Sequence, residues 1–332
     1  MTRAFGEELQ RALIERSGEF LFVVGCARSG TTLVHSYLNE AEDVCLLCED
    51  NAFSGITRQY FREWYNTIWA SRPPTKGYHI PEIPGGGMFW FDCYLALKER
   101  YGIAGSKFAF GPFADEYWLE IDRYLQRFLQ SYFPKATYLL TLRRPGEAVA
   151  SMGRMFPGLH VGSLLDAWIK TLQHQLAILG SMDRARFVFH DTVSVALLEG
   201  ICHGLGVQPP AKTGRFVTPR EERGSFAQFP APDQLDAVSA NLLAQLELAY
   251  THVRGAIGDT TGRPGAETHT AELVRTLWDE LNRLRGDPSG RFLLTPQPLP
   301  ADEAAGSQFD ERQSGDRETP MTKSTAVGET VV

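Results

Sequence analysis

Cysteine is scarce in this chain, which has five in 332 residues. An odd and sparse set excludes a disulfide framework as the basis of the fold. Cys45 and Cys48 form a CxxC, but no second pair follows at the spacing of a zinc site. Because the surrounding run DVCLLC is apolar, we expect both thiols to pack inside a buried strand.

The chain also lacks an excess of positive charge. Lys and Arg number 33 against 40 Asp and Glu, which gives a formal net charge of −7. A protein whose main partner is a phosphate backbone usually has the opposite balance, so the sequence argues against a nucleic-acid partner. A local basic pocket for a small anion is compatible with this total.

Long hydrophobic runs are absent as well. The first residues carry charges throughout, and the apolar run at 20–24 is far too short to cross a bilayer. We therefore expect a cytoplasmic protein without a membrane partner. Nothing in the sequence predicts an oligomeric state.

The sequence does contain an alternation of short apolar runs and amphipathic segments. Five runs are typical of buried strands, at 20–25, 43–48, 106–110, 137–143 and 186–190. Helical periodicity lies between them and continues over 233–257 and 268–285. This pattern predicts an α/β fold in which helices flank a central parallel sheet, with ligands bound at the carboxyl ends of the strands.

A candidate phosphate-binding loop follows the first run. Residues 25–32, GCARSGTT, have the G-x-x-x-x-G spacing of a loop whose backbone N–H groups face an anion. A nucleotide triphosphatase has Lys and then Ser or Thr after the second glycine, whereas this chain has Thr31 and Thr32 there, and its cation lies inside the loop as Arg28. The sequence thus predicts a P-loop three-layer fold that binds an anion with less charge than a triphosphate, without magnesium.

A second basic cluster follows the fourth run. Arg143 and Arg144 end that run, and Ser151 lies eight residues after Arg143. A strand end followed by two helical turns can place Arg143 and Ser151 around one phosphate. The guanidinium would be a bidentate donor and the hydroxyl a further one.

Together, CARSGTT at 26–32 and RRPGEAVAS at 143–151 resemble the motifs of the sulfotransferase superfamily that uses 3′-phosphoadenosine 5′-phosphosulfate (PAPS). The resemblance covers about 20–257 and is closest to the tyrosylprotein sulfotransferases and related bacterial enzymes. It implies that Arg143 and Ser151 bind the 3′-phosphate. It also implies that the 5′-phosphosulfate is bound by Arg28, Ser29, Gly30, Thr31 and Thr32.

The same branch implies the catalytic residues. It has a Glu 21 residues after the loop Arg, which is Glu49 here, and a Lys on the third strand, which is Lys107 here. Glu49 would be the general base, while Lys107 and Arg28 would stabilise the charge that grows on the leaving group. His79, in the Pro- and Gly-rich segment 71–87, is the reserve base, and we expect no metal.

The sequence thus predicts one sulfotransferase domain over 1–300, with its core at about 20–257 and accessory helices at about 258–300. A disordered tail is expected at 301–332, where core-forming residues are few. The enzyme would transfer a sulfuryl group from PAPS, as co-substrate, to a hydroxyl of a small molecule or metabolite by in-line displacement.

Two alternatives stay open. The first is a P-loop kinase or NTPase, in which Asp191 after the fifth run would end a Walker B strand; Asp191 is also placed to cap the next helix. The second is a non-catalytic nucleotide-binding protein.

Overall fold

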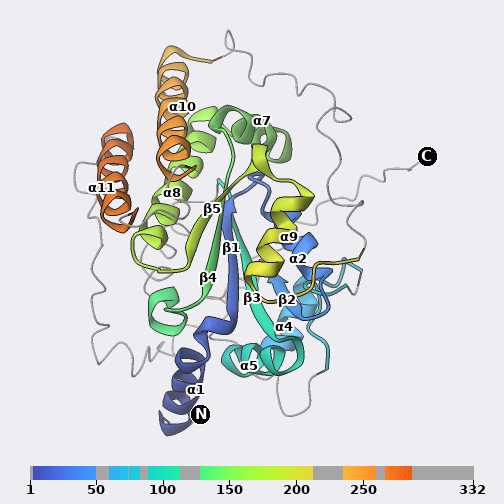
Figure 1. The fold of residues 1–332 in the computed structure, drawn as a ribbon. Helices are drawn as coiled ribbons and strands as arrows, with labels where there is room; N and C mark the ends of the chain where they lie inside the picture. Colours follow the sequence, from blue (N-terminus) through green and yellow to red (C-terminus); the bar gives the residue numbers. More distant parts are fainter. Residues whose placement is uncertain are drawn as a thin grey trace. The chain divides into compact units, whose positions relative to one another are not determined.

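The computed structural model describes residues 3–49, 60–73, 75–82, 89–112, 128–211, 235–258 and 266–285. Five strands form one parallel sheet in the order β2-β3-β1-β4-β5 (Figure 1). They are β1 (Phe20–Cys26), β2 (Val44–Cys48), β3 (Ile103–Phe110), β4 (Thr137–Leu142) and β5 (Ala185–Phe189). All five predicted strands are therefore confirmed, each within three residues of its expected bounds.

Helices follow the strands and cover the sheet. The described α-helices are α1 (Arg3–Glu15), α2 (Thr31–Asn39), α4 (Phe61–Ile68), α5 (Trp90–Tyr101), α7 (Pro145–Met155), α8 (Val161–Leu179), α9 (Val195–Gly204), α10 (Ala237–Gly258) and α11 (Ala266–Arg285). Two short 3₁₀ turns are η1 (Ser17–Glu19) and η2 (His190–Thr192). None of these described helices is long and apolar enough to cross a membrane.

The alternation of side chains along β1 explains the three layers. Leu21 and Val23 face one side of the sheet, where they pack with residues of α2 and α9. Phe22 and Val24 face the other side, where α5 and α8 cover them. α10 and α11 pack with α7 and α8 in a further apolar cluster (Figure 1). The predicted α/β fold with a central parallel sheet flanked by helices is confirmed.

Three expectations need comment. Asp191 does not cap the helix after β5, because η2 intervenes and α9 starts at Val195, where the Ser194 hydroxyl accepts the N–H of Leu197 at 3.2 Å. The tail expected at 301–332 lies outside the described residues. The thiols of Cys45 and Cys48 are free and buried, as expected.

Candidate functional site

The loop between β1 and α2 turns within four residues. Gly30, at φ 97°, precedes the first residue of α2, and a Cβ there would lie 2.9 Å from the ring of His190. Gly25 is required by a close approach, because a Cβ on it would lie 2.8 Å from the Thr141 carbonyl oxygen and closer still to its hydroxyl. The G-x-x-x-x-G spacing thus lets the chain leave the sheet tightly against β4 and enter α2.

Ser29 fastens this loop to the neighbouring strand. Its side chain is buried, its Oγ lies 2.8 Å from Thr141 Oγ1, and its backbone N–H donates to the Cys26 carbonyl at 3.0 Å. Ser29 therefore holds the shape of the loop, and its assignment as a donor ligand stays a prediction.

On the β3 side of the loop, the structure brings three predicted residues together. Lys107 Nζ lies 2.8 Å from Glu49 Oε1 and donates to Thr32 Oγ1 at 3.2 Å. The parallel register explains this, since Lys107 pairs with Cys48 and the Glu49 N–H donates to the Lys107 carbonyl at 3.0 Å. The Lys107 side chain is 2% exposed and that of Glu49 43%. The ion pair thus joins a buried ammonium to an open carboxylate.

Backbone strain is concentrated at this site. Among the described residues, Arg28 (φ 69°) and Glu49 (φ 51°) are the non-glycine residues in the left-handed region. That conformation is disfavoured for residues with a Cβ and persists where the surrounding structure enforces it, often at functional sites. Glu49 directly follows β2, and Arg28 lies two residues after the end of β1, at the same edge of the sheet.

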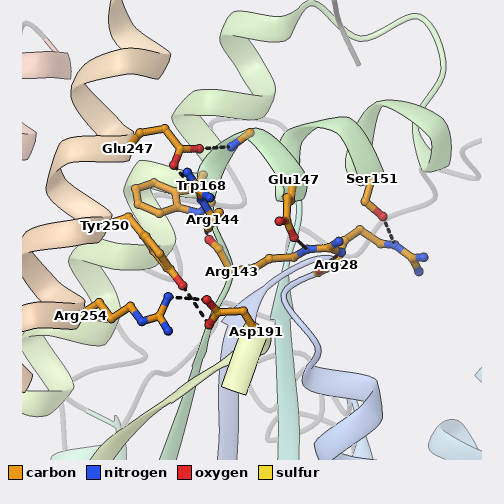
Figure 2. A network of polar contacts seen from close by, with 11 residues as sticks. Arg28, Arg143, Arg144, Glu147, Ser151, Trp168, Asp191, Glu247, Tyr250 and Arg254 are labelled. Carbon is orange, nitrogen blue, oxygen red and sulfur yellow. Dashed lines mark hydrogen bonds and ion pairs between the residues drawn. The ribbon is translucent and has the colours of Figure 1, made fainter. Parts of the chain in front are cut away.

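On the β4 side, Arg28 lies between Arg143 and Ser151 and forms a hydrogen bond with each of them (Figure 2). Arg28 Nε donates to Ser151 Oγ at 3.0 Å, and Arg143 Nη1 donates to the Arg28 carbonyl at 3.3 Å. Arg143 Nε also donates to Glu147 Oε2 at 3.0 Å. Arg143 and Ser151 are both buried. The structure therefore assembles the predicted pair, with the loop arginine between its members.

The two groups lie on opposite sides of the loop, because β3 and β4 flank β1 in the sheet. Neighbouring strands are about 4.8 Å apart, so the groups are separated by roughly 10 Å. Arg28 is predicted both to stabilise charge and to bind the donor, and its hydrogen bond to Ser151 favours the second role.

Sequence reasoning missed the residues that hold Arg143 in place. Glu147 lies four residues after Arg143, and this helical spacing could have predicted their ion pair. Trp168 Nε1 donates to the Arg143 carbonyl at 3.0 Å (Figure 2). Thr141 anchors the loop through its hydrogen bond with Ser29. The sequence around Trp168 and Thr141 does not predict their contacts with the site, because those contacts depend on how elements that are distant in the sequence pack together.

Other candidate residues lie elsewhere. The Asp191 carboxylate is held by α10, through an ion pair with Arg254 and a hydrogen bond from Tyr250 at 3.3 Å. Burial, together with the nearby Lys107 ammonium, lowers the pKa of His35 to about 3, so this histidine is neutral at physiological pH. Among the described residues, His79 makes no hydrogen bond or ion pair with Glu49 or Lys107. No group of three metal-ligating side chains occurs in the described part of the chain.

Comparisons with known proteins show which family the chain belongs to. A search of curated proteins returned no match. Among solved structures, the chain is similar to the sulfotransferase domain of the Synechococcus PCC 7002 olefin synthase, at 15% identity and a TM-score of 0.39, over 77% of this chain and 93% of that one. The model of the sulfotransferase family matches residues 21–190, more than half of the 332 residues. The chain therefore belongs to the sulfotransferase family and is a transferase of sulfuryl groups.

Proposed function

We propose that this protein transfers a sulfuryl group from PAPS to a hydroxyl of a small-molecule acceptor, with neither nucleic acid nor a membrane as partner. The observation that carries the proposal is the ion pair of Lys107 and Glu49 beside a phosphate-type loop. The family supports a sulfuryl donor, and the side chains on both sides of the loop fit the two charged ends of PAPS.

The donor would lie across the loop. Its 5′-phosphosulfate would face the start of α2, where Thr31 and Thr32 stand at the positive end of the helix dipole. Its 3′-phosphate would lie on the β4 side, near Arg143 and Ser151. A separation of roughly 10 Å between the two groups suits a nucleotide that carries phosphates on both sides of its ribose.

The reaction would be an in-line displacement at sulfur. The acceptor oxygen forms a bond to sulfur while the bond from sulfur to the bridging oxygen of the 5′-phosphate breaks. The acceptor proton passes to the Glu49 carboxylate, and Lys107 stabilises the charge that grows on the departing phosphate. Adenosine 3′,5′-bisphosphate leaves with the bonding electron pair.

The ion pair offers a way to couple donor binding to base activation. The Lys107 ammonium holds one oxygen of Glu49 at 2.8 Å. An incoming phosphosulfate would attract Lys107, so that Glu49 becomes available to a hydroxyl. Because Glu49 is 43% exposed and Lys107 is buried, the acceptor would approach from solvent and the donor from the loop side.

Transfer can be tested by incubating the purified protein with radiolabelled PAPS and a panel of hydroxylated acceptors, with products identified by mass. We expect one sulfated product for each adenosine 3′,5′-bisphosphate released. Magnesium-dependent turnover of ATP without sulfuryl transfer would instead support a P-loop kinase or NTPase. Tight binding of PAPS without transfer to any acceptor would support a non-catalytic nucleotide-binding protein.

A further inference from the structure

A buried tyrosine holds the strand end that precedes Glu49. Tyr65, on α4, is fully buried, and its hydroxyl reaches the last residue of β2. The Cys48 N–H donates to the Tyr65 hydroxyl oxygen at 2.8 Å, and that hydroxyl lies 3.2 Å from the Cys48 carbonyl oxygen. The same hydroxyl donates to the Gly77 carbonyl at 2.6 Å. Tyr65 therefore joins the end of β2 to the segment 75–80.

The segment 75–80 packs closely against β2 and α4. The Cys48 N–H also donates to the Gly77 carbonyl, at 2.8 Å. Gly77 lies at φ 92°, and a Cβ on it would lie 2.6 Å from a backbone oxygen of β2, so only glycine fits there. Asn66, on α4, makes two hydrogen bonds with the backbone of Ile80, at 2.8 and 3.0 Å. These contacts hold α4, the segment 75–80 and the end of β2 together.

The peptide group between Cys48 and Glu49 is held at both of its polar atoms. Its carbonyl oxygen lies 3.2 Å from the Tyr65 hydroxyl, and its N–H donates to the Lys107 carbonyl at 3.0 Å. Glu49 has φ 51°, a conformation that persists in a residue with a Cβ where the surrounding structure enforces it. The fixed peptide group and this φ together set the direction in which the Glu49 side chain leaves the backbone. That direction brings its carboxylate to 2.8 Å from the Lys107 ammonium.

From these contacts we infer that Tyr65 is a positioning residue for Glu49. Its side chain is buried and its hydroxyl meets backbone atoms, so it acts through Glu49 and not on a substrate. It keeps the carboxylate where an acceptor hydroxyl would meet it. The inference rests on the proposed function, because it takes Glu49 to be the general base.

Tyr65→Phe removes only the hydroxyl. Initial rates would be measured with radiolabelled PAPS and the acceptor of the panel that the wild type sulfates fastest, and calorimetry would measure the affinity for adenosine 3′,5′-bisphosphate. We expect turnover to fall by about ten- to a hundredfold, because a displacement of about 1 Å in a reacting group can cost about a hundredfold in rate. Affinity for the bisphosphate should change by less than about twofold, since the loop after β1 is left intact.

The double variant Tyr65→Phe/Glu49→Gln separates positioning from a general loss of structure. If Tyr65 acts through the Glu49 carboxylate, adding Tyr65→Phe to Glu49→Gln should lower turnover by less than about a further twofold. Tyr138→Phe is the matched control, because Tyr138 is also fully buried and donates to the Phe133 carbonyl at 2.8 Å. Tyr138 lies near the start of β4, at the opposite edge of the sheet. Tyr138→Phe should lower resistance to urea, as Tyr65→Phe does, but keep normal turnover.

Three outcomes would contradict these expectations. Turnover of Tyr65→Phe within about twofold of the wild type would overturn the inference and leave the proposed function standing. The same follows if Tyr65→Phe lowers turnover as much in the Glu49→Gln background as in the wild type, or if Tyr138→Phe loses as much turnover as Tyr65→Phe. Failure of the wild type to transfer a sulfuryl group to any acceptor would overturn the proposed function, and the inference with it.

Discussion

Glu49 and Lys107 differ in exposure although they form one ion pair, and that difference assigns them different roles in the proposed reaction. An open carboxylate can meet an acceptor hydroxyl, whereas a buried ammonium can meet only a ligand that enters along the loop. The strained backbone of Glu49 holds the carboxylate at the end of β2, directly beside Lys107.

Glu49→Gln is expected to lower turnover by about 10²–10⁴-fold, the usual contribution of a positioned general base. The affinity for PAPS should persist or rise slightly, because a negative charge near the sulfuryl group is removed. Steady-state kinetics and donor titration measure both quantities on the same preparation.

Glu42→Gln is the control for that substitution, since Glu42 is an exposed carboxylate just before β2. It should leave both turnover and donor affinity unchanged. Near-normal turnover in Glu49→Gln would show that the base is another residue, and His79 would then be the next residue to substitute. Lys107→Ala, in contrast, should lower both turnover and donor affinity, because Lys107 faces the donor.

His35 makes stability depend on pH. Its pKa is about 3 in the folded protein and about 6.5 in an unfolded chain, so the unfolded chain binds the proton first as pH falls. Stability from this group is complete above pH 6.5 and decreases below it. Between pH 6.5 and 5 the loss is about 2 kcal/mol, at 1.36 kcal/mol for each pH unit.

Urea unfolding at pH 7 and pH 5 measures this loss. His35→Gln keeps a donor for the Leu46 carbonyl, which His35 Nε2 contacts at 2.9 Å, but cannot take up the proton. Its free energy of unfolding should therefore change less between the two pH values than that of the wild type. Identical changes in both proteins would show that His35 does not resist protonation.

Single residues of the site could be predicted from the sequence where a short motif combines a suitable side chain with a suitable spacing. The loop glycines, Arg28 and Arg143 follow from motifs of a few residues, so no knowledge of the fold is needed to find them. The anchors were not predictable, because Thr141 reaches Ser29 only after β4 has been placed beside β1. The resemblance to a family supplied Glu49 and Lys107, and their contact became visible only in the register of β2 and β3.

Among the helices, α10 holds the start of α7. Arg144, the residue before α7, makes no capping bond with its side chain. Glu247 of α10 replaces that cap, because one of its oxygens accepts the Gly146 N–H at 3.0 Å and the other accepts from Arg144 at 3.1 Å (Figure 2). α10 thus fixes the helix that carries Glu147 and Ser151.

Glu247→Ala removes the acceptor for the Gly146 N–H and is expected to lower the free energy of unfolding by about 1 kcal/mol, a typical value for a lost helix cap. Glu272→Ala on α11 is the control, since Glu272 is an exposed glutamate on a different helix. Urea denaturation measures both variants. Equal midpoints for the two would mean that the contact between α10 and α7 contributes nothing to stability.

Strands could be predicted from the sequence where an apolar run is long and contains no charged residue, as in β1 and β4. β3 begins three residues earlier than expected, because Gly105 interrupts the apolar run and weakens the strand signal. The turn η2 was not foreseen, since the sequence from His190 to Ser194 fits a direct helix start as well as a short turn.

In the molecule as a whole, charge is distributed unevenly. The chain carries a net charge of −7, yet the described edge of the sheet gathers Arg28, Lys107 and Arg143 beside one loop. An overall negative charge disfavours nonspecific binding to polyanions. A small anion would still find a locally positive site.

Binding of adenosine 3′,5′-bisphosphate is expected to need no divalent cation. In a triphosphate-binding loop, a Lys and a hydroxyl after the second glycine hold the β- and γ-phosphates and a magnesium ion. Here Thr31 and Thr32 occupy those positions, and the phosphate charge would be met by Arg28, Lys107 and Arg143 instead. Calorimetric titration with a chelator and with magnesium should therefore give dissociation constants that agree within about twofold. Added monovalent salt should weaken binding in both cases, because it screens the partly exposed charges at the site. Binding that occurs only with magnesium would contradict this expectation and favour the P-loop kinase or NTPase.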